Sequence, residues 1–216
     1  MSRYHNIDDL PQTLPVFPLS GVLLLPRGQL PLNVFEPRYL AMVDAALSGN
    51  RLIGMIQPVE REEITLKPPL SAVGCAGRIV AYRETDDGRY LITLSGICRF
   101  AVSEELSVAT AFRQVRSNFA PYAGDLAESE ESDFPRERLL GALKTYLSQR
   151  DLKADWQSVT SAPGEALVNA LSMLCPFEPA EKQALLEAGN WEERVAVLTA
   201  LLEMSGAGTD GPASMN

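Results

Sequence analysis

The sequence contains few of the residues that build metal sites and catalytic sites. It has one histidine, His5, and three cysteines without a Cys-x-x-Cys pair. A structural zinc site needs about four Cys or His ligands in paired spacing, and a triad would depend on a histidine near the N-terminus. We therefore expect no metal, no cofactor and no catalytic residues. We interpret the cysteines as free, buried thiols; they are Cys75, Cys98 and Cys175.

Nucleotide-binding and dyad motifs are also missing. The sequence has no Gly-Lys dipeptide, so it has no Walker A loop, whose backbone amides and lysine hold phosphates. None of the four lysines has a serine in a context that favours a Ser-Lys dyad; they are Lys67, Lys144, Lys153 and Lys182. Paired carboxylates among the 28 acidic residues leave a hydrolase formally open. That alternative would require a deep polar pocket with strongly shifted carboxylate pKa values.

Long apolar runs and excess positive charge are absent as well. No segment approaches the ~20 apolar residues that span a bilayer, and the polar N-terminal residues MSRYHNIDDLPQ do not resemble a signal peptide. The net charge of −9 and the pI of about 4.7 disfavour binding to phosphate backbones and anionic lipids. We expect a cytoplasmic protein with no DNA or membrane partner.

What the sequence does contain predicts an α+β protein in two parts. Short apolar runs separated by Pro and Gly predict strands over Leu14–Phe17, Val22–Leu25 and Leu30–Phe35. Pro31 makes the third an edge strand or a bulge. Further strands are expected at Leu52–Ile56, Val73–Tyr82, Tyr90–Ser95, Ile97–Val102 and Val108–Ser117.

A helix and a hairpin interrupt these strands. Pro37 suits the first turn of a helix whose apolar face contains Val43, and Gly49 suits its end. Asp87-Gly88 supplies the positive φ that a tight hairpin turn needs. We expect a β subdomain over 13–118, an acidic linker over 119–135, a helical subdomain over 136–205 and a disordered tail over 206–216.

The segment LPVFPLSGVLLLPRGQLPLNVFEPRYLAMVDAALSGNRLIGMIQP, residues 14–58, resembles the start of the Lon protease N-terminal domain. Val73-Gly74-Cys75-Ala76-Gly77-Arg78-Ile79 and the segment from Asp87-Gly88-Arg89-Tyr90 to Gly96-Ile97-Cys98-Arg99-Phe100 resemble later parts of that family. One departure is Pro26-Arg27-Gly28, where the family usually has Pro-Gly. The resemblance implies a small PUA-like β-barrel with one inserted helix, followed by a C-terminal helical bundle.

Five residues are candidates for peptide binding: Phe35, Glu36, Arg38, Tyr39 and Arg99. In the alternative interpretation, Glu36 caps the helix, Arg38 pairs with a carboxylate, and Phe35 and Tyr39 pack in the core. Arg99 would then be an outward strand residue, paired across the sheet. The long loop Val59–Ser71 is a further candidate.

The family resemblance implies a non-catalytic module that binds unfolded or extended polypeptide segments, with a protease or chaperone as a conceivable partner. Two alternatives stay open: an RNA-associated PUA-like factor and a small-ligand-binding protein. A contiguous patch formed by Arg78, Arg83, Arg89, Arg99, Arg113 and Arg116 would favour RNA.

Overall fold

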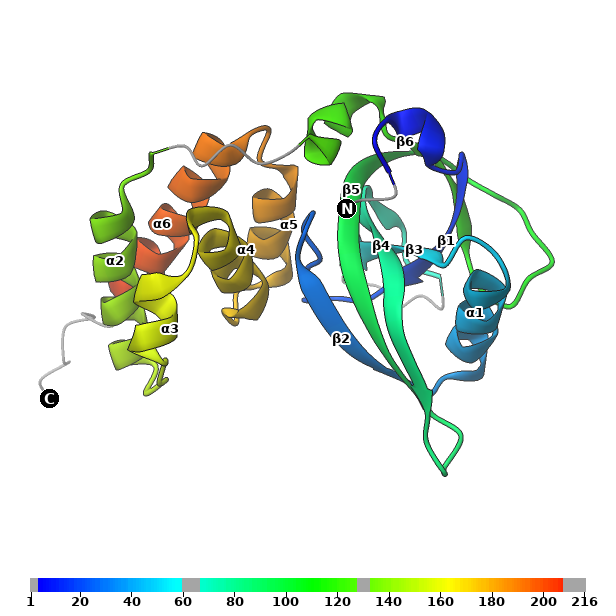
Figure 1. Ribbon diagram of the computed structural model, residues 1–216, viewed down its shortest axis with the longest axis horizontal. Helices are drawn as coiled ribbons and strands as arrows, with labels where there is room; N and C mark the ends of the chain where they lie inside the picture. Colours follow the sequence, from blue (N-terminus) through cyan, green and yellow to red (C-terminus); the bar gives the residue numbers. More distant parts are fainter. Residues whose placement is uncertain (1–3, 60–66, 128–132, 208–216) are drawn as a thin grey trace, which may run out of the picture. The chain divides into compact units, whose positions relative to one another are not determined.

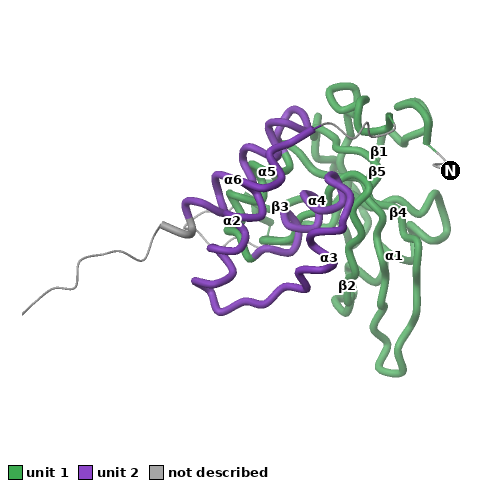
Figure 2. Tube along the Cα trace, turned by 60° about the vertical axis from the view of Figure 1, so that its left-hand side comes forward, with its two compact units in different colours: residues 1–128, 176–186 green, residues 129–175, 187–216 purple. Residues whose placement is uncertain are grey.

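The computed structural model describes residues 4–59, 67–127 and 133–207. The chain forms two compact units, coloured separately in Figure 2. Unit 1 contains residues 1–128 and 176–186, and unit 2 contains residues 129–175 and 187–216. The chain therefore leaves unit 1, returns to it for eleven residues (176–186), and leaves again. The boundaries expected from the sequence did not include this return.

Unit 1 contains a six-stranded mixed sheet, and the protein is of the α+β class (Figure 1). The strands are β1 (Thr13–Pro18), β2 (Gln29–Val34), β3 (Leu52–Pro58), β4 (Leu70–Glu84), β5 (Tyr90–Glu105) and β6 (Gln114–Asn118). Their order is β2-β5-β4-β3-β1-β6, and β6 also pairs with β5. β1 and β3 are parallel, whereas the other pairs are antiparallel. β2 lies at an edge, so the prediction from Pro31 is confirmed.

Two strand predictions were wrong in part or whole. Val22–Leu25 does not join the sheet, although Leu23, Leu24 and Leu25 are buried. This segment instead approaches the sheet closely, because a Cβ on Gly96 would lie 2.0 Å from the Leu25 carbonyl oxygen. The last strand begins at Gln114 and not at Val108, since Thr110 Oγ1 donates to the Phe112 carbonyl in a local turn.

The core of unit 1 surrounds Phe100, which is fully buried. Cβ atoms on Gly54 and Gly74 would lie 2.8 Å and 2.6 Å from the Phe100 ring, so glycine at both positions makes room for this aromatic side chain. The buried cluster consists of Tyr4, Leu10, Leu14, Val16, Leu52, Ile56, Ala76, Cys98, Phe100, Val115 and Phe119.

The expected helix is α1 (Pro37–Ser48), with Pro37 in its first turn and Gly49 at its C-cap. The expected hairpin is also present: Gly88 has φ +77° and its N–H donates to the Thr85 carbonyl at 2.9 Å. In the loop before β4, Val59 N–H donates to the Pro69 carbonyl and Arg113 donates to the Pro68 carbonyl. The rest of that predicted binding loop, residues 60–66, lies outside the described residues.

Besides α1, the described part of unit 1 contains η1 (Ile7–Asp9), η2 (Ala120–Leu126) and most of α5 (Pro179–Glu187). η2 falls within the segment 119–135 that was expected to be a solvated linker. It is ordered because Asp125, one of the acids attributed to the linker, pairs with buried Arg99. Gln57 and Gln183 connect α5 to the strands, with Gln57 donating to the Pro179 carbonyl and Gln183 to the Val73 carbonyl.

Unit 2 is helical and consists mainly of α2 (Arg136–Gln149), α3 (Trp156–Ser161), α4 (Gly164–Leu174) and α6 (Trp191–Ala207). The Arg136 guanidinium donates to three carbonyls at the C-terminal end of α3, Val159, Thr160 and Ala162. The Trp191 ring stands edge-on to Phe134, 5.7 Å between centroids. α6 extends to Ala207, into the segment expected to be a tail, and 208–216 lie outside the described residues.

Candidate functional site

A hollow of about 470 Å³ lies on the outer part of the sheet, where β2, β5 and the distal half of β4 run side by side. Three rows of cross-strand neighbours form it. The rows are Pro31–Thr93–Ala81, Leu32–Ile92–Tyr82 and Asn33–Leu91–Arg83.

The alternation of side chains decides which rows face the hollow. Ile92, in the middle row, is only 2% exposed, so that row points into the protein interior along β5. The flanking rows therefore present their side chains to the hollow, and three of these six residues are apolar: Pro31, Ala81 and Leu91. Thr93 and Asn33 add neutral polar groups, and Arg83 adds a positive charge.

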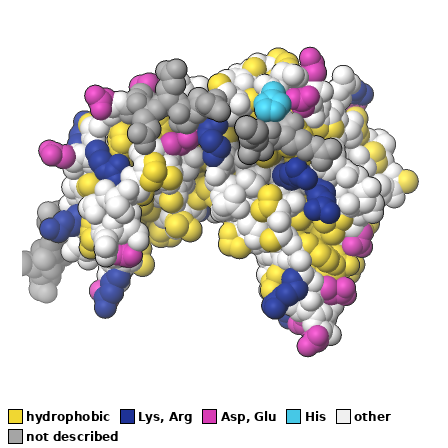
Figure 3. Space-filling view, in the orientation of Figure 1, with side chains coloured by type: hydrophobic (Ala, Val, Ile, Leu, Met, Phe, Trp, Pro, Cys, Tyr) yellow, Lys and Arg dark blue, Asp and Glu magenta, His cyan; other side chains and the backbone are white. Residues whose placement is uncertain are grey.

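Large apolar side chains are exposed near this surface. Phe35 follows β2 and is 62% exposed, and Val80 of β4 is 53% exposed. Tyr82 is also exposed, but it belongs to the middle row and lies on the opposite face of the sheet. Val80 lies at the register shift between Ile79 and Ala81, where the bulge adds a residue to β4. Figure 3 shows hydrophobic side chains gathered on this unit with Lys and Arg side chains beside them. Exposed aromatic and aliphatic side chains around an apolar hollow are typical of a surface that binds a partner.

The motif Phe35–Tyr39 divides between surface and core. Phe35 is exposed, with the Arg89 guanidinium 5.8 Å from its ring centroid. Glu36 makes no side-chain cap to α1, contrary to the capping interpretation, and instead forms an ion pair with Arg38 at 2.8 Å. Tyr39 is buried and packs on Phe17 with 4.2 Å between ring centroids. Burial raises the pKa of Tyr39.

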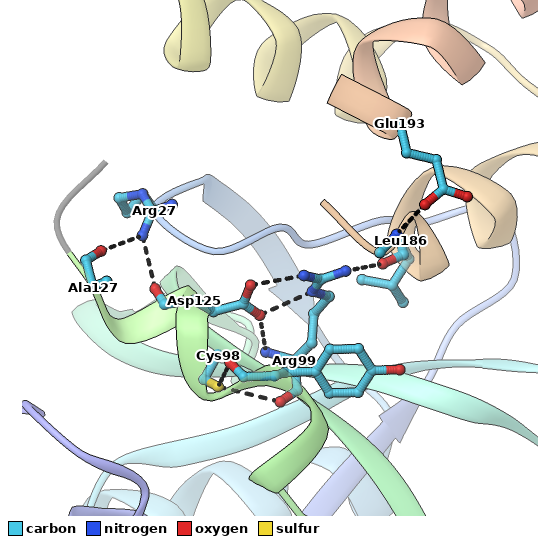
Figure 4. A network of polar contacts seen from close by, with 9 residues as sticks. Arg27, Cys98, Arg99, Asp125, Ala127, Leu186 and Glu193 are labelled. Carbon is cyan, nitrogen blue, oxygen red and sulfur yellow. Dashed lines mark hydrogen bonds and ion pairs between the residues drawn. The ribbon is translucent and has the colours of Figure 1, made fainter. Parts of the chain in front are cut away.

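Arg99 has a different environment from the other four candidates. It is 5% exposed, its Nε and Nη2 donate to the two Asp125 oxygens at 2.9 Å and 2.8 Å, and its Nη1 donates to the Leu186 carbonyl at 3.1 Å (Figure 4). Burial alone would lower the pKa of this guanidinium, but the hydrogen bonds and charge of Asp125 raise it. Arg99 therefore neither points outward from the strand nor stands free for a ligand.

The arginines considered for RNA do not form one free basic patch. Four of the six pair with carboxylates: Arg89 with Asp87, Arg99 with Asp125, Arg113 with Glu105 and Arg116 with Glu104. Arg113, together with Lys67, lowers the pKa of Glu105. Arg78 and Arg83 are what is left of the expected patch, which argues against phosphate-backbone binding on this surface.

The described residues give no support to metal or carboxylate chemistry. Across 4–59, 67–127 and 133–207, no group of three His, Cys, Asp or Glu could hold a metal ion. A second hollow, of about 260 Å³ near η1, is lined by one carboxylate, Asp8, and the hollow on the sheet is lined by none. Within the same ranges, no helix is long and apolar enough to cross a membrane.

Comparison with known proteins gives the family. A family model described as the ATP-dependent protease La (LON) substrate-binding domain matches residues 13–204. The chain belongs to this family. As a Lon substrate-binding domain, it is similar to Lon protease 2 of Myxococcus xanthus, with 26% identity over 91% of this chain and 24% of that protein. It is also similar to the Lon protease of Desulfosudis oleivorans, with 31% identity over 51% of this chain and 14% of that protein.

Solved structures show the same fold. A Lon N-terminal domain protein from Xanthomonas campestris matches with a TM-score of 0.59 and 23% identity, over 87% of this chain and 97% of that one. The Lon N-terminal domain of Mycobacterium avium complex matches with a TM-score of 0.60 and 16% identity, over 91% and 99%. This Lon substrate-binding domain spans about a quarter or less of the length of the two Lon proteases named above.

The residues that line the hollow were missed by sequence reasoning, which concentrated on the distinctive Phe35–Tyr39 motif. A signal was present in the strand Tyr90–Ser95, where Leu91 is apolar although it alternates with the inward-facing Ile92 and Leu94. An apolar residue on the outward face of a strand could have marked this surface.

Proposed function

We propose that this Lon substrate-binding domain is a non-catalytic module that binds unfolded or extended polypeptide segments in a reducing cytoplasm. The observation that carries the proposal is the apolar hollow over β2, β5 and β4, with Phe35 and Val80 exposed nearby. We also propose that the sheet corresponds to a PUA-like barrel, supported by the return of β6 to β5.

Two physical contributions would retain a bound segment. Apolar side chains placed over Pro31, Ala81 and Leu91 would gain about 25 cal/mol for each Å² removed from water. The unpaired side of β2 would offer backbone groups for strand addition. Pro31 has no N–H, so this edge offers one donor fewer than an ordinary strand. We therefore expect apolar side-chain contacts to contribute more than backbone hydrogen bonds.

The five candidates from the sequence enter this proposal unequally. Phe35, and the exposed ion pair of Glu36 with Arg38, are available to a ligand, and we keep them as proposed contacts at its margin. Tyr39 and Arg99 are buried, and we propose for them a supporting role.

A charge placed in the hollow tests the proposal. Leu91→Asp should weaken binding of a fluorescein-labelled apolar peptide about tenfold, because the loss of one apolar contact on binding is worth on the order of 1.4 kcal/mol. Fluorescence anisotropy measures the affinity. Val108→Asp is the matched control, since Val108 is 40% exposed and does not line the hollow. Equal affinities of the two variants, with circular dichroism unchanged, would refute the hollow as the binding site.

A further inference from the structure

Arg83 is the single charged residue among those that line the hollow, all of which are described by the structure. It is exposed, and it forms no side-chain hydrogen bond or ion pair within residues 4–59, 67–127 and 133–207. Other exposed arginines of unit 1 are neutralised: Arg38 pairs with Glu36, and Arg89 pairs with Asp87. The hollow is therefore lined by one guanidinium that no carboxylate of the described residues neutralises.

The nearest acidic residue along β4 is Glu84, which belongs to the next cross-strand row, Val34–Tyr90–Glu84. Because successive residues of a strand point to opposite faces, Glu84 and Arg83 lie on different faces of the sheet. Asp86 and Asp87 lie in the turn beyond the strand, where Asp87 is already paired. The charge that faces the hollow is therefore positive.

Neutral donors stand in the same rows as Arg83. Asn33 shares its row, with Leu91 between them, and Thr93 lies in the adjacent outward row. Neither side chain forms a hydrogen bond with another described residue. Directly opposed cross-strand residues have Cβ atoms about 5 Å apart, so Arg83 and Leu91 can touch neighbouring groups of one ligand.

We propose that the hollow selects polypeptide segments in which an Asp or Glu stands next to apolar residues. This inference rests on the proposed polypeptide-binding function and names the class of segment. The carboxylate would accept hydrogen bonds from the Arg83 guanidinium, whose planar donors match its two oxygens. The neighbouring apolar side chain would lie over Leu91 and Pro31. A Lys or Arg in the segment would be repelled by the positive charge of Arg83, which no carboxylate lining the hollow compensates.

The test uses three labelled peptides that differ at one central position, Glu, Gln or Lys, in an otherwise apolar and neutral sequence. Against the full chain, the Glu peptide should bind about threefold more tightly than the Gln peptide and more tightly still than the Lys peptide, since an exposed ion pair is weak. Arg83→Glu should reverse this order. Arg83→Lys should keep the preference for the Glu peptide, with a smaller ratio between the affinities for the Glu and Gln peptides.

Arg116→Gln is the matched control, because Arg116 is an exposed strand arginine outside the hollow and should leave the order unchanged. The preference should vanish in about 1 M salt, where the screening length falls to ~3 Å. Equal binding of the three peptides to the wild-type chain, or an unchanged order in Arg83→Glu, would overturn this inference alone. Failure of all three to bind would overturn the proposed function as well.

Discussion

At the scale of single residues, the space around a position determines which residue is tolerated there as much as the chemistry of the side chain does. Arg27 has φ +65°, a region that favours glycine. Its N–H donates to the Gly96 carbonyl at 2.8 Å, and its Nη1 donates to the Asp125 carbonyl at 2.7 Å. These contacts offset the backbone strain, so an arginine is tolerated there. Gly96, by contrast, cannot change.

We predict that Gly96→Ala destabilises the domain by at least about 2 kcal/mol, because the added Cβ would lie 2.0 Å from the backbone oxygen of Leu25, which cannot move as a side chain can. Urea unfolding followed by circular dichroism measures the change. Gly141→Ala in α2 is the control: its Cβ meets nothing within 4 Å, so the helix should gain up to about 1 kcal/mol. Equal stabilities would show that the Leu25 segment moves freely.

At the scale of elements, one buried arginine connects three parts of unit 1. Arg99 belongs to β5, its partner Asp125 belongs to η2, and its other acceptor, the Leu186 carbonyl, belongs to α5. The Arg99 guanidinium also lies 4.7 Å from the Tyr122 ring centroid. Residues 125 and 186 lie close to two of the points where the chain passes into unit 2. Arg99 thus fixes the ends of the segments that lead to the other unit.

We expect Arg99→Met to cost about 3–5 kcal/mol, because it leaves the Asp125 carboxylate buried without its partner. The double variant Arg99→Met with Asp125→Leu should recover much of this loss, since it removes both charges. Guanidinium denaturation of the single and double variants measures the coupling. Arg138→Met provides the comparison, because the Arg138–Glu203 pair is exposed and its loss should change stability little. A single-variant loss no larger than that of Arg138→Met would contradict the anchoring role.

At the scale of the whole molecule, each unit contains its own reporter of unfolding. Cys75 and Cys98 are buried in unit 1, and Cys175 is buried in unit 2. Burial, with a smaller effect of the Asp125 charge, raises the pKa of Cys98 to about 12. The folded domain should therefore hold this thiol in its protonated, unreactive form at neutral pH.

We predict that a chromogenic disulfide reagent labels the native protein slowly near pH 8 and labels three thiols after denaturation. The raised pKa of Cys98 also predicts the direction in which stability changes at alkaline pH. Its contribution to stability is complete below the unfolded value near 9 and is lost as pH rises towards 12. The thermal unfolding temperatures of Cys98→Ala and of the wild type should therefore approach each other between those two pH values. Rapid native labelling of Cys98, identified by mass spectrometry, would contradict its burial.

The sequence alone determined what depends on local rules. Pro31 indicated an edge strand, Asp87-Gly88 a hairpin, and Pro37 and Gly49 the ends of α1, because backbone conformation and hydrogen-bonding capacity are properties of those residues themselves. The order of its motifs also identified the Lon substrate-binding domain. The environments of the candidate site residues depended instead on distant partners.

Tertiary structure decided which side chains are available. Arg99 and Arg83 are both strand arginines in the sequence, yet one is buried against Asp125, 26 residues away, and the other faces an open hollow. Asp125 looked like a linker acid until that pairing placed it inside unit 1. Val22–Leu25 has the composition of a strand but lies where Gly96 lets its backbone approach the sheet. Burial and pairing arise from contacts between segments far apart in the chain, so no local pattern could have revealed them.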